Sequence, residues 1–158
     1  MKNILLPMDI KGIKQHQQNR YPLLFVDQIT NLIPGESATG VKNFSYNEWF
    51  FPAHFEDDPN VPGFIQMETL VQVFIMTFLS IDEFKGEKTN FVKADKVVFK
   101  RKIIPGEKLV VEAKLDSFRR GVAIGSAVGR VSDEEACSAS FVIAVPSYLE
   151  RFKPKQKL

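Results

Sequence analysis

Two side chains are of types and at a spacing that suit acid–base chemistry. His54 lies in a segment that also holds Pro52, Pro59 and Pro62, and Glu68 follows inside a strongly apolar run. An imidazole accepts a proton near neutral pH, and burial is expected to raise the pKa of a carboxyl group so that it keeps its proton. This pair suits removal of a proton next to a carbonyl group, coupled to the loss of a leaving group.

Two further groups extend this pair. Gln72 follows Glu68 by four residues, so a helix would place both on one face and let the amide orient the carboxyl group. A helix that begins at Gly63 would also present unpaired backbone N–H groups and the positive end of its dipole. Those groups suit a carbonyl oxygen that gains negative charge during a reaction.

Structural roles account for the same residues. A lone loop histidine such as His54 is more often structural or exposed than catalytic. A hydrogen bond from a backbone donor would be enough to stabilise a buried Glu68, so its burial fits a structural role as well as a catalytic one. Residue types and spacing alone therefore leave both interpretations open.

The element that carries Glu68 is expected to be a buried helix. Residues 63–84 are apolar on nearly all sides of a helical projection, which is typical of a helix surrounded by protein. A membrane span is the less favoured interpretation, because Gln66, Gln72 and Thr77 interrupt the run and Glu68 would be costly in hydrocarbon.

Period-two alternation predicts long antiparallel strands after this helix. The expected strands and their connecting turns are 96–103, Pro105-Gly106, 109–116, Arg119-Arg120-Gly121, 122–131, Asp133-Glu134-Glu135 and 136–145. Before the helix, a hairpin is expected to join 23–29 to 39–44 through Pro34-Gly35. Strands on both sides of one buried helix, without βαβ alternation, predict an α+β fold in which an antiparallel sheet wraps a central helix.

Composition bounds the remaining possibilities. The 158 residues carry 21 basic and 19 acidic side chains, so we expect one domain over 1–158 and no nucleic-acid partner. The single Cys137 cannot form an internal disulfide, and the two histidines make a metal site improbable. Without an export signal, the expected compartment is the cytoplasm. A helical segment is expected within residues 1–20, ending at Arg20-Tyr21-Pro22, and a flexible tail over 147–158.

The motifs, in order along the chain, resemble those of the 3-hydroxyacyl-[acyl-carrier-protein] dehydratases of fatty acid synthesis. The matching segments are Arg20-Tyr21-Pro22, Leu24 to Asp27, Asn47-Glu48, Phe50-Phe51, His54-Phe55, Pro59, Pro62-Gly63, Glu68, Gln72, Phe99-Lys100-Arg101, Pro105-Gly106 and Arg119-Arg120-Gly121. The resemblance implies the hot-dog fold, a long central helix wrapped by an antiparallel sheet. It also implies homodimers, in some members three per hexamer, with active sites shared across the dimer interface.

The resemblance implies roles for three residues. His54 would take the α proton of a (3R)-3-hydroxyacyl thioester, and Glu68 from the partner subunit would protonate the departing hydroxyl group. The products would be a trans-2-enoyl thioester and water, with no cofactor or metal. Gly63 would offer its backbone N–H to the thioester carbonyl. The related dehydratase that also isomerises the double bond typically has Asp at the acid position, so Glu68 favours dehydration alone.

The resemblance further implies an acyl tunnel and a basic rim that receives the acidic carrier protein. Candidates for the tunnel wall are Phe64, Ile65, Leu70, Phe74 and Phe91, although any one of them is more typical of ordinary core. Candidates for the docking rim are Lys96, Lys100, Arg101, Lys102, Arg119 and Arg120. Lysines on an exposed strand also protect against edge-to-edge aggregation, so this alternative stays open.

The chain departs from the family pattern near the histidine. Glu56-Asp57-Asp58 place three carboxylates beside His54, where they would favour the protonated imidazole and repel an acidic carrier unless they point into water. Asn19 stands where the family commonly has His, and we assign it no chemical role. A non-catalytic subunit that binds acyl chains or carrier proteins is therefore the alternative function. A thioesterase on the same fold is less favoured, because thioesterases lack this His and Glu pattern.

Overall fold

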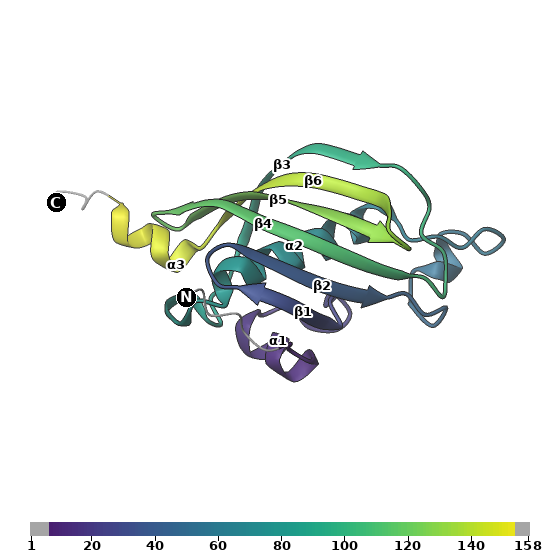
Figure 1. Cartoon of the computed structure of the whole chain (residues 1–158), viewed down its shortest axis with the longest axis horizontal. Coiled ribbons are helices and arrows are strands. Elements are labelled where there is room, and N and C mark those ends of the chain that lie inside the picture. The colour runs from purple at the N-terminus through teal and green to yellow at the C-terminus, as the bar shows by residue number, and fades with distance from the viewer. Residues whose placement is uncertain (1–6, 154–158) are drawn as a thin grey trace.

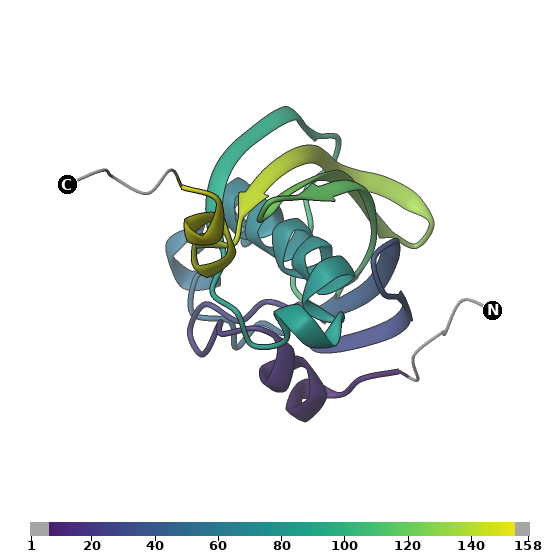
Figure 2. The ribbon, with the colours of Figure 1, turned by 90° about the vertical axis from the view of Figure 1, so that its left-hand side faces the viewer.

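The computed structural model describes residues 7–153, and one antiparallel sheet wrapped around one long helix dominates it. The six strands lie in the order β1-β2-β4-β5-β6-β3. Their bounds are β1 Gln28–Ile33, β2 Ser37–Asn43, β3 Asn90–Phe99, β4 Lys108–Arg119, β5 Val122–Val131 and β6 Glu134–Ala144. The long helix α2, Gly63–Leu79, lies behind the sheet in Figure 1 and runs along its concave side in Figure 2. The predicted α+β class is confirmed, as is the hot-dog arrangement.

Close contact between α2 and the sheet depends on glycine. A Cβ atom at Gly125 would lie 2.1 Å from the Lys114 carbonyl oxygen and 2.5 Å from the Phe74 ring. At Gly40 it would lie 2.6 Å from a methyl group of Val73. The absence of side chains at these positions lets large apolar residues of α2 rest directly on the strands. The helix is therefore buried on nearly all sides, as its apolar pattern predicted.

The prediction that α2 reaches residue 84 is wrong. The helix ends at Leu79, Ile81 adopts an extended conformation, and the chain forms a separate 3-10 turn, η2, over Asp82–Phe84. Phe84 is nevertheless buried, edge-on against the rings of Phe118 and Tyr148. The apolar pattern correctly indicated that Phe84 is buried. It did not require a helix, because a 3-10 turn buries this side chain equally well.

The predicted strand over 96–103 and its turn into the next strand are also wrong. β3 ends at Phe99, pairs with β6, and forms an edge of the sheet, whereas β4 lies between β2 and β5. β4 buries one face through Leu109 and Val111, whereas nearly every β3 side chain is exposed. The period-two alternation of a strand does not reveal which neighbour it pairs with.

The first hairpin is present, but its first strand begins later in the chain than predicted. β1 begins at Gln28, and the preceding Phe25 and Val26 are buried without belonging to a strand. Gly35 forms the turn with a positive φ of 76°, which glycine adopts without strain. The apolar run before β1 therefore serves the core and does not extend the sheet.

The two ends of the described chain are helical. Helix α1 spans Ile10–His16, begins with the Asp9 side chain accepting a hydrogen bond from the Gly12 N–H, and stops before the predicted end at Arg20. Where a flexible tail was expected, α3, Pro146–Leu149, and the 3-10 turn η3, Glu150–Phe152, continue the structure. The rest of that expected tail, 154–158, lies outside the described residues. No helix within residues 7–153 is long and apolar enough to cross a membrane.

Candidate active site

His54 follows a short 3-10 turn, η1, over Phe51–Ala53, and its side chain is half-buried. Its Nδ1 lies 3.1 Å from the carbonyl oxygen of Asn60. A carbonyl oxygen only accepts hydrogen bonds, so Nδ1 carries the hydrogen and Nε2 keeps its lone pair in the neutral ring. The geometry therefore selects the tautomer in which Nε2 acts as a base.

Backbone hydrogen bonds fix the loop that carries His54. The N–H of Asn60 donates to the His54 carbonyl oxygen at 3.0 Å, and Phe55 and Asp58 exchange two hydrogen bonds of 3.1 Å each. The carboxylates of Glu56, Asp57 and Asp58 are exposed, and Asp58 forms an ion pair with Lys102. Because all three lie at the surface, water screens them from the imidazole.

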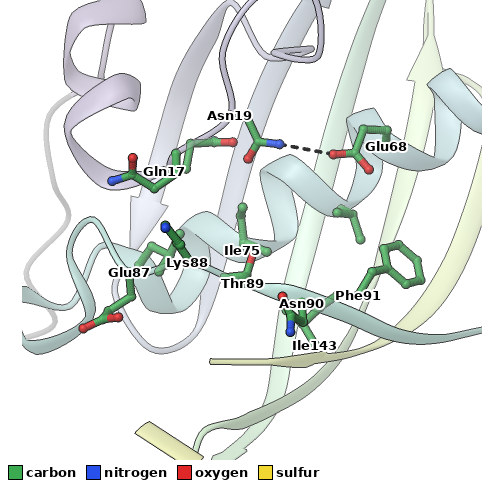
Figure 3. Close-up of a pocket in the computed structure, with 13 residues that line it drawn as sticks. Gln17, Asn19, Glu68, Ile75, Glu87, Lys88, Thr89, Asn90, Phe91 and Ile143 are labelled. Atoms are coloured by element: carbon green, nitrogen blue, oxygen red, sulfur yellow. Dashed lines mark hydrogen bonds between the residues drawn. The ribbon is translucent and has the colours of Figure 1, made fainter. Parts of the chain in front are cut away.

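Glu68 lies in the second turn of α2 and is half-buried. Burial raises its pKa, and a hydrogen bond donated by Gln72 Nε2 to Glu68 Oε1, 2.8 Å long, opposes part of that rise. The raised pKa and the contact with Gln72 confirm the two expectations drawn from the sequence. Asn19 Nδ2 donates a second, longer bond of 3.4 Å to the same Oε1, which Figure 3 shows.

Gln72 is itself held in place, since it is fully buried. Its Oε1 accepts a hydrogen bond from the Phe25 N–H at 2.7 Å, and its Nε2 donates to the Leu23 carbonyl oxygen at 2.6 Å. These two contacts fix which end of the amide is the donor. The Gln72 N–H group that faces Glu68 is therefore pre-organised by the segment before β1.

A single chain does not bring His54 and Glu68 together. His54 lines a cavity of about 370 Å³, and Glu68 lines another of about 320 Å³. The first cavity is formed by His54, Asn60, Val61, Gly63, Gln66, Phe99, Lys100, Arg101 and Lys102. The second is formed by Gln17, Gln18, Asn19, Glu68, Val71, Ile75, Leu79, Glu87, Lys88, Thr89, Asn90, Phe91 and Ile143. The two sets share no residue.

Gly63 shares the cavity of His54, as the sequence led us to expect for a group that acts on the same substrate. It is the first residue of α2, where backbone N–H groups have no partner inside the helix. A Cβ atom here would lie 3.1 Å from the Phe99 ring. Glycine therefore lets β3 approach the helix N-terminus closely.

The five candidates for the tunnel wall lie in different surroundings. Ile65, Leu70 and Phe74 are completely buried core residues and line neither of these two cavities, and Phe64 is 64% exposed. Of the five candidates, Phe91 alone lines one of them, the cavity of Glu68. A helix that is apolar on all sides gives no sign in the sequence of which face lines a cavity, and the tunnel wall stays a prediction.

Three apolar residues of α2 line the cavity of Glu68 and were not predicted to do so. Val71, Ile75 and Leu79 follow one another at four-residue spacing, and Val71 lies three residues after Glu68. This spacing places all of them on the face of the carboxyl group. Tracing that face from Glu68 would have found them.

The six predicted docking residues do not form one cluster. Lys100, Arg101 and Lys102 line the cavity of His54, whereas Arg119 and Arg120 lie at the turn between β4 and β5. That turn is at the opposite end of the sheet in Figure 1. Lys96 lies in β3 with a positive φ of 51°.

The three basic residues beside His54 all have acidic partners. Besides the pair between Lys102 and Asp58, Lys100 pairs with Glu135 at 3.1 Å. The guanidinium of Arg101 contacts Glu107 at 2.6 Å and Glu134 at 3.7 Å. Within residues 7–153, no three His, Cys, Asp or Glu side chains are grouped so that they could hold a metal ion.

Comparison with known proteins adds evidence independent of this geometry. Residues 17–140 match the family model described as the FabA-like domain. The 3-hydroxyacyl-[acyl-carrier-protein] dehydratase FabZ of Clostridium novyi is 38% identical over 140 residues, covering 89% of this chain and 99% of the relative. The FabZ dehydratase of a Thermoanaerobacter species is 40% identical over 135 residues, covering 85% and 95%.

Among solved structures, the dehydratase heterocomplex ApeI:P from Xenorhabdus doucetiae matches with a TM-score of 0.73 at 12% identity, over 88% of this chain and 95% of that one. At such low identity this match supports the fold alone. The family model and the curated relatives establish the family. The chain belongs to the FabA-like family, as a relative of the 3-hydroxyacyl-[acyl-carrier-protein] dehydratases.

Proposed function

We propose that this protein dehydrates a (3R)-3-hydroxyacyl-[acyl-carrier-protein] to the trans-2-enoyl form in fatty acid biosynthesis. The proposal rests on two groups suited to acid–base catalysis in a chain of this family. One is a histidine whose Nε2 is free to accept a proton, and the other is a half-buried acid whose pKa is raised. Its proposed compartment is the cytoplasm.

In the proposed reaction, His54 accepts a proton and Glu68 donates one. His54 Nε2 takes the α proton, and the C–H electrons move toward the thioester carbonyl, where the Gly63 N–H stabilises the developing charge. The C–O bond at the β carbon then breaks, and neutral Glu68 gives its proton to the departing hydroxyl group, which leaves as water. The double bond forms between the α and β carbons. The imidazolium then loses its proton and the carboxylate gains one, which restores the enzyme.

The separation of the two cavities in one chain supports a site shared by two protomers. We propose a homodimer in which His54 of one protomer meets Glu68 of the other. The exposed edge strand β3 supports this, because Phe91 is 47% and Val92 is 60% exposed on a strand with one open edge. Apolar edges of this kind favour pairing with a second chain. A second copy that pairs along β3 would cover these side chains.

The proposed macromolecular substrate is an acyl carrier protein. Lys100, Arg101 and Lys102 line the cavity of His54, so they would lie beside the entering phosphopantetheine thioester. Asp58, the partner of Lys102, is 56% exposed, and exchange of such a surface ion pair costs little free energy. An acidic carrier would therefore replace this partner of Lys102 without a large penalty, whereas Arg101 and Glu107 form a partly buried pair that is expected to persist.

Incubation of the pure protein with a 3-hydroxyacyl carrier substrate tests this proposal. Enoyl product, abolished in His54→Ala and Glu68→Gln, is the expected result. His16→Ala and Glu112→Gln are matched controls that should keep activity, since His16 lies on α1 and Glu112 lies on an exposed position of β4. Free thiol without enoyl product would indicate a thioesterase. Substrate binding without either product would indicate a non-catalytic subunit, and each of these outcomes overturns the proposal.

A further inference from the structure

Two amide groups bind the same oxygen of Glu68. Gln72 Nε2 and Asn19 Nδ2 donate to Oε1 at 2.8 Å and 3.4 Å. When the Glu68 carboxyl group is neutral, the oxygen that receives two N–H donors is its carbonyl oxygen, because the O–H oxygen is itself a donor. The proton of the neutral acid must then be on Oε2, the oxygen that neither amide contacts.

The segment that carries Asn19 is held firmly. The Arg20 guanidinium donates to the carbonyl oxygens of Lys14, Gln17 and Asn19 at 2.8 to 2.9 Å, and so closes the C-terminal end of α1. Gln17 Nε2 donates to the Gln72 carbonyl oxygen at 3.4 Å, which ties the same segment to α2. Asn19 therefore reaches Glu68 from a pre-organised loop, as Figure 3 shows.

We propose that Asn19 is a positioning residue for the acid: with Gln72 it fixes the Glu68 carboxyl group so that Oε2 carries and delivers the proton. This inference rests on the proposed function, and it corrects the expectation that Asn19 has no chemical role. In this proposal the Arg20 motif, which lies far from Glu68 in sequence, contributes by holding Asn19 in place. A residue that acts only through packing would not depend on an N–H donor at this position.

Three variants separate a donor from a packing role. Asn19→Asp keeps the size and removes the donor, Asn19→Leu removes all polarity, and Asn19→His keeps an N–H donor. We expect kcat to fall about tenfold in the first two with KM nearly unchanged, and Asn19→His to keep most of the activity. Gln15→Leu, on an exposed position of α1, is the matched control for loss of an amide.

The pH profile reports the same contact. An N–H donor stabilises the carboxylate more than the neutral acid, so its loss raises the pKa of Glu68. The basic limb of kcat, which reports the acid, is therefore expected to move to higher pH in Asn19→Leu and Asn19→Asp. A fall in kcat with an unmoved basic limb would overturn the proposal, and so would wild-type kcat in both variants or loss of activity in Asn19→His.

Titration of the Glu68 carboxyl carbon by NMR keeps this test independent of turnover. The carboxyl resonance should titrate at higher pH in Asn19→Leu, which removes the donor without adding a charge, than in the unmodified protein. If the unmodified protein forms no enoyl product, the proposed function fails, and the titration still decides the contact. An identical titration in both proteins would overturn the role of Asn19, whatever the activity.

Discussion

Glu68 illustrates how a residue that we propose to be catalytic opposes the stability of the fold. Burial raises its pKa above the ordinary 4.5, so the folded protein binds this proton more tightly than the unfolded chain does. The associated stability is complete at pH values below the unfolded pKa. It is lost as the pH rises from the unfolded value through the raised folded value. Above the unfolded pKa, folding must either return a proton to Glu68 or bury its charge, so the side chain makes folding less favourable.

Glu68→Gln removes that penalty because the amide has no charge to bury. The variant is expected to lose activity and to gain melting temperature relative to the unmodified protein, more at about pH 8 than at about pH 5. Thermal melts of both proteins across this pH range measure the effect. An equal shift at both pH values would contradict the assignment of a raised pKa in the folded state.

Cys137 gives a second test at the scale of one residue. Its side chain is completely buried between strands, and burial raises the pKa of the thiol to about 12. The reactive thiolate is therefore scarce and shielded. A thiol reagent is expected to leave the native protein unmodified and to label one cysteine after denaturation. Rapid labelling under native conditions would show that the strand pair around Cys137 opens readily.

The packing of α2 against the sheet is the decisive feature at the scale of elements. Gly125→Ala would place a methyl group 2.1 Å from the Lys114 carbonyl oxygen and 2.5 Å from the Phe74 ring. Neither the backbone of β4 nor a buried aromatic ring can yield without strain. We expect a loss of about 2 to 4 kcal/mol in the free energy of unfolding, measured by chemical denaturation.

Ser126→Ala, on the neighbouring position of β5, is the control for that experiment. Its side chain points to the other face of the sheet and is half-buried, so its loss should change stability by less than about 1 kcal/mol. Equal destabilisation by both variants would contradict the close approach of α2 at Gly125.

Helices and strands could be predicted from the sequence where the apolar pattern is compatible with only one secondary structure. The run around α2 and the alternation of β5 and β6 each fit one structure, and Glu68 stood out because an acid is rare in such a run. Strand order was not predictable, because the period-two pattern of β3 fits pairing with β4 or β6 equally. The cavity-lining Val71 and Ile75 were missed, since a helix that is apolar all round needs the sheet in place before one face differs from another.

Association is the question at the scale of the whole molecule, and the edge strand β3 is where we expect it. Val92→Lys places a charge on its exposed surface and should shift the protein from dimer to monomer, with loss of activity. Light scattering coupled to size exclusion measures the change. Ile10→Lys, which alters an exposed apolar residue on α1, should stay dimeric. An unmodified protein that is monomeric and active would contradict the proposed dimer.

The most direct test of the shared site mixes two inactive variants. His54→Ala and Glu68→Gln are co-expressed with different affinity tags so that the mixed dimer can form. In a mixed dimer, one site combines the intact His54 of one protomer with the intact Glu68 of the other. Random pairing makes half of all dimers mixed, so about a quarter of the unmodified activity should return.

A second mixture controls for subunit exchange. When the unmodified chain is paired with the double variant His54→Ala/Glu68→Gln, a shared site leaves about a quarter of the activity, whereas a site within one protomer leaves about half. We expect activity to recover in the first mixture and to fall to about a quarter in the second. No recovery in purified mixed dimers of the two single variants would contradict a site built from His54 of one protomer and Glu68 of its partner.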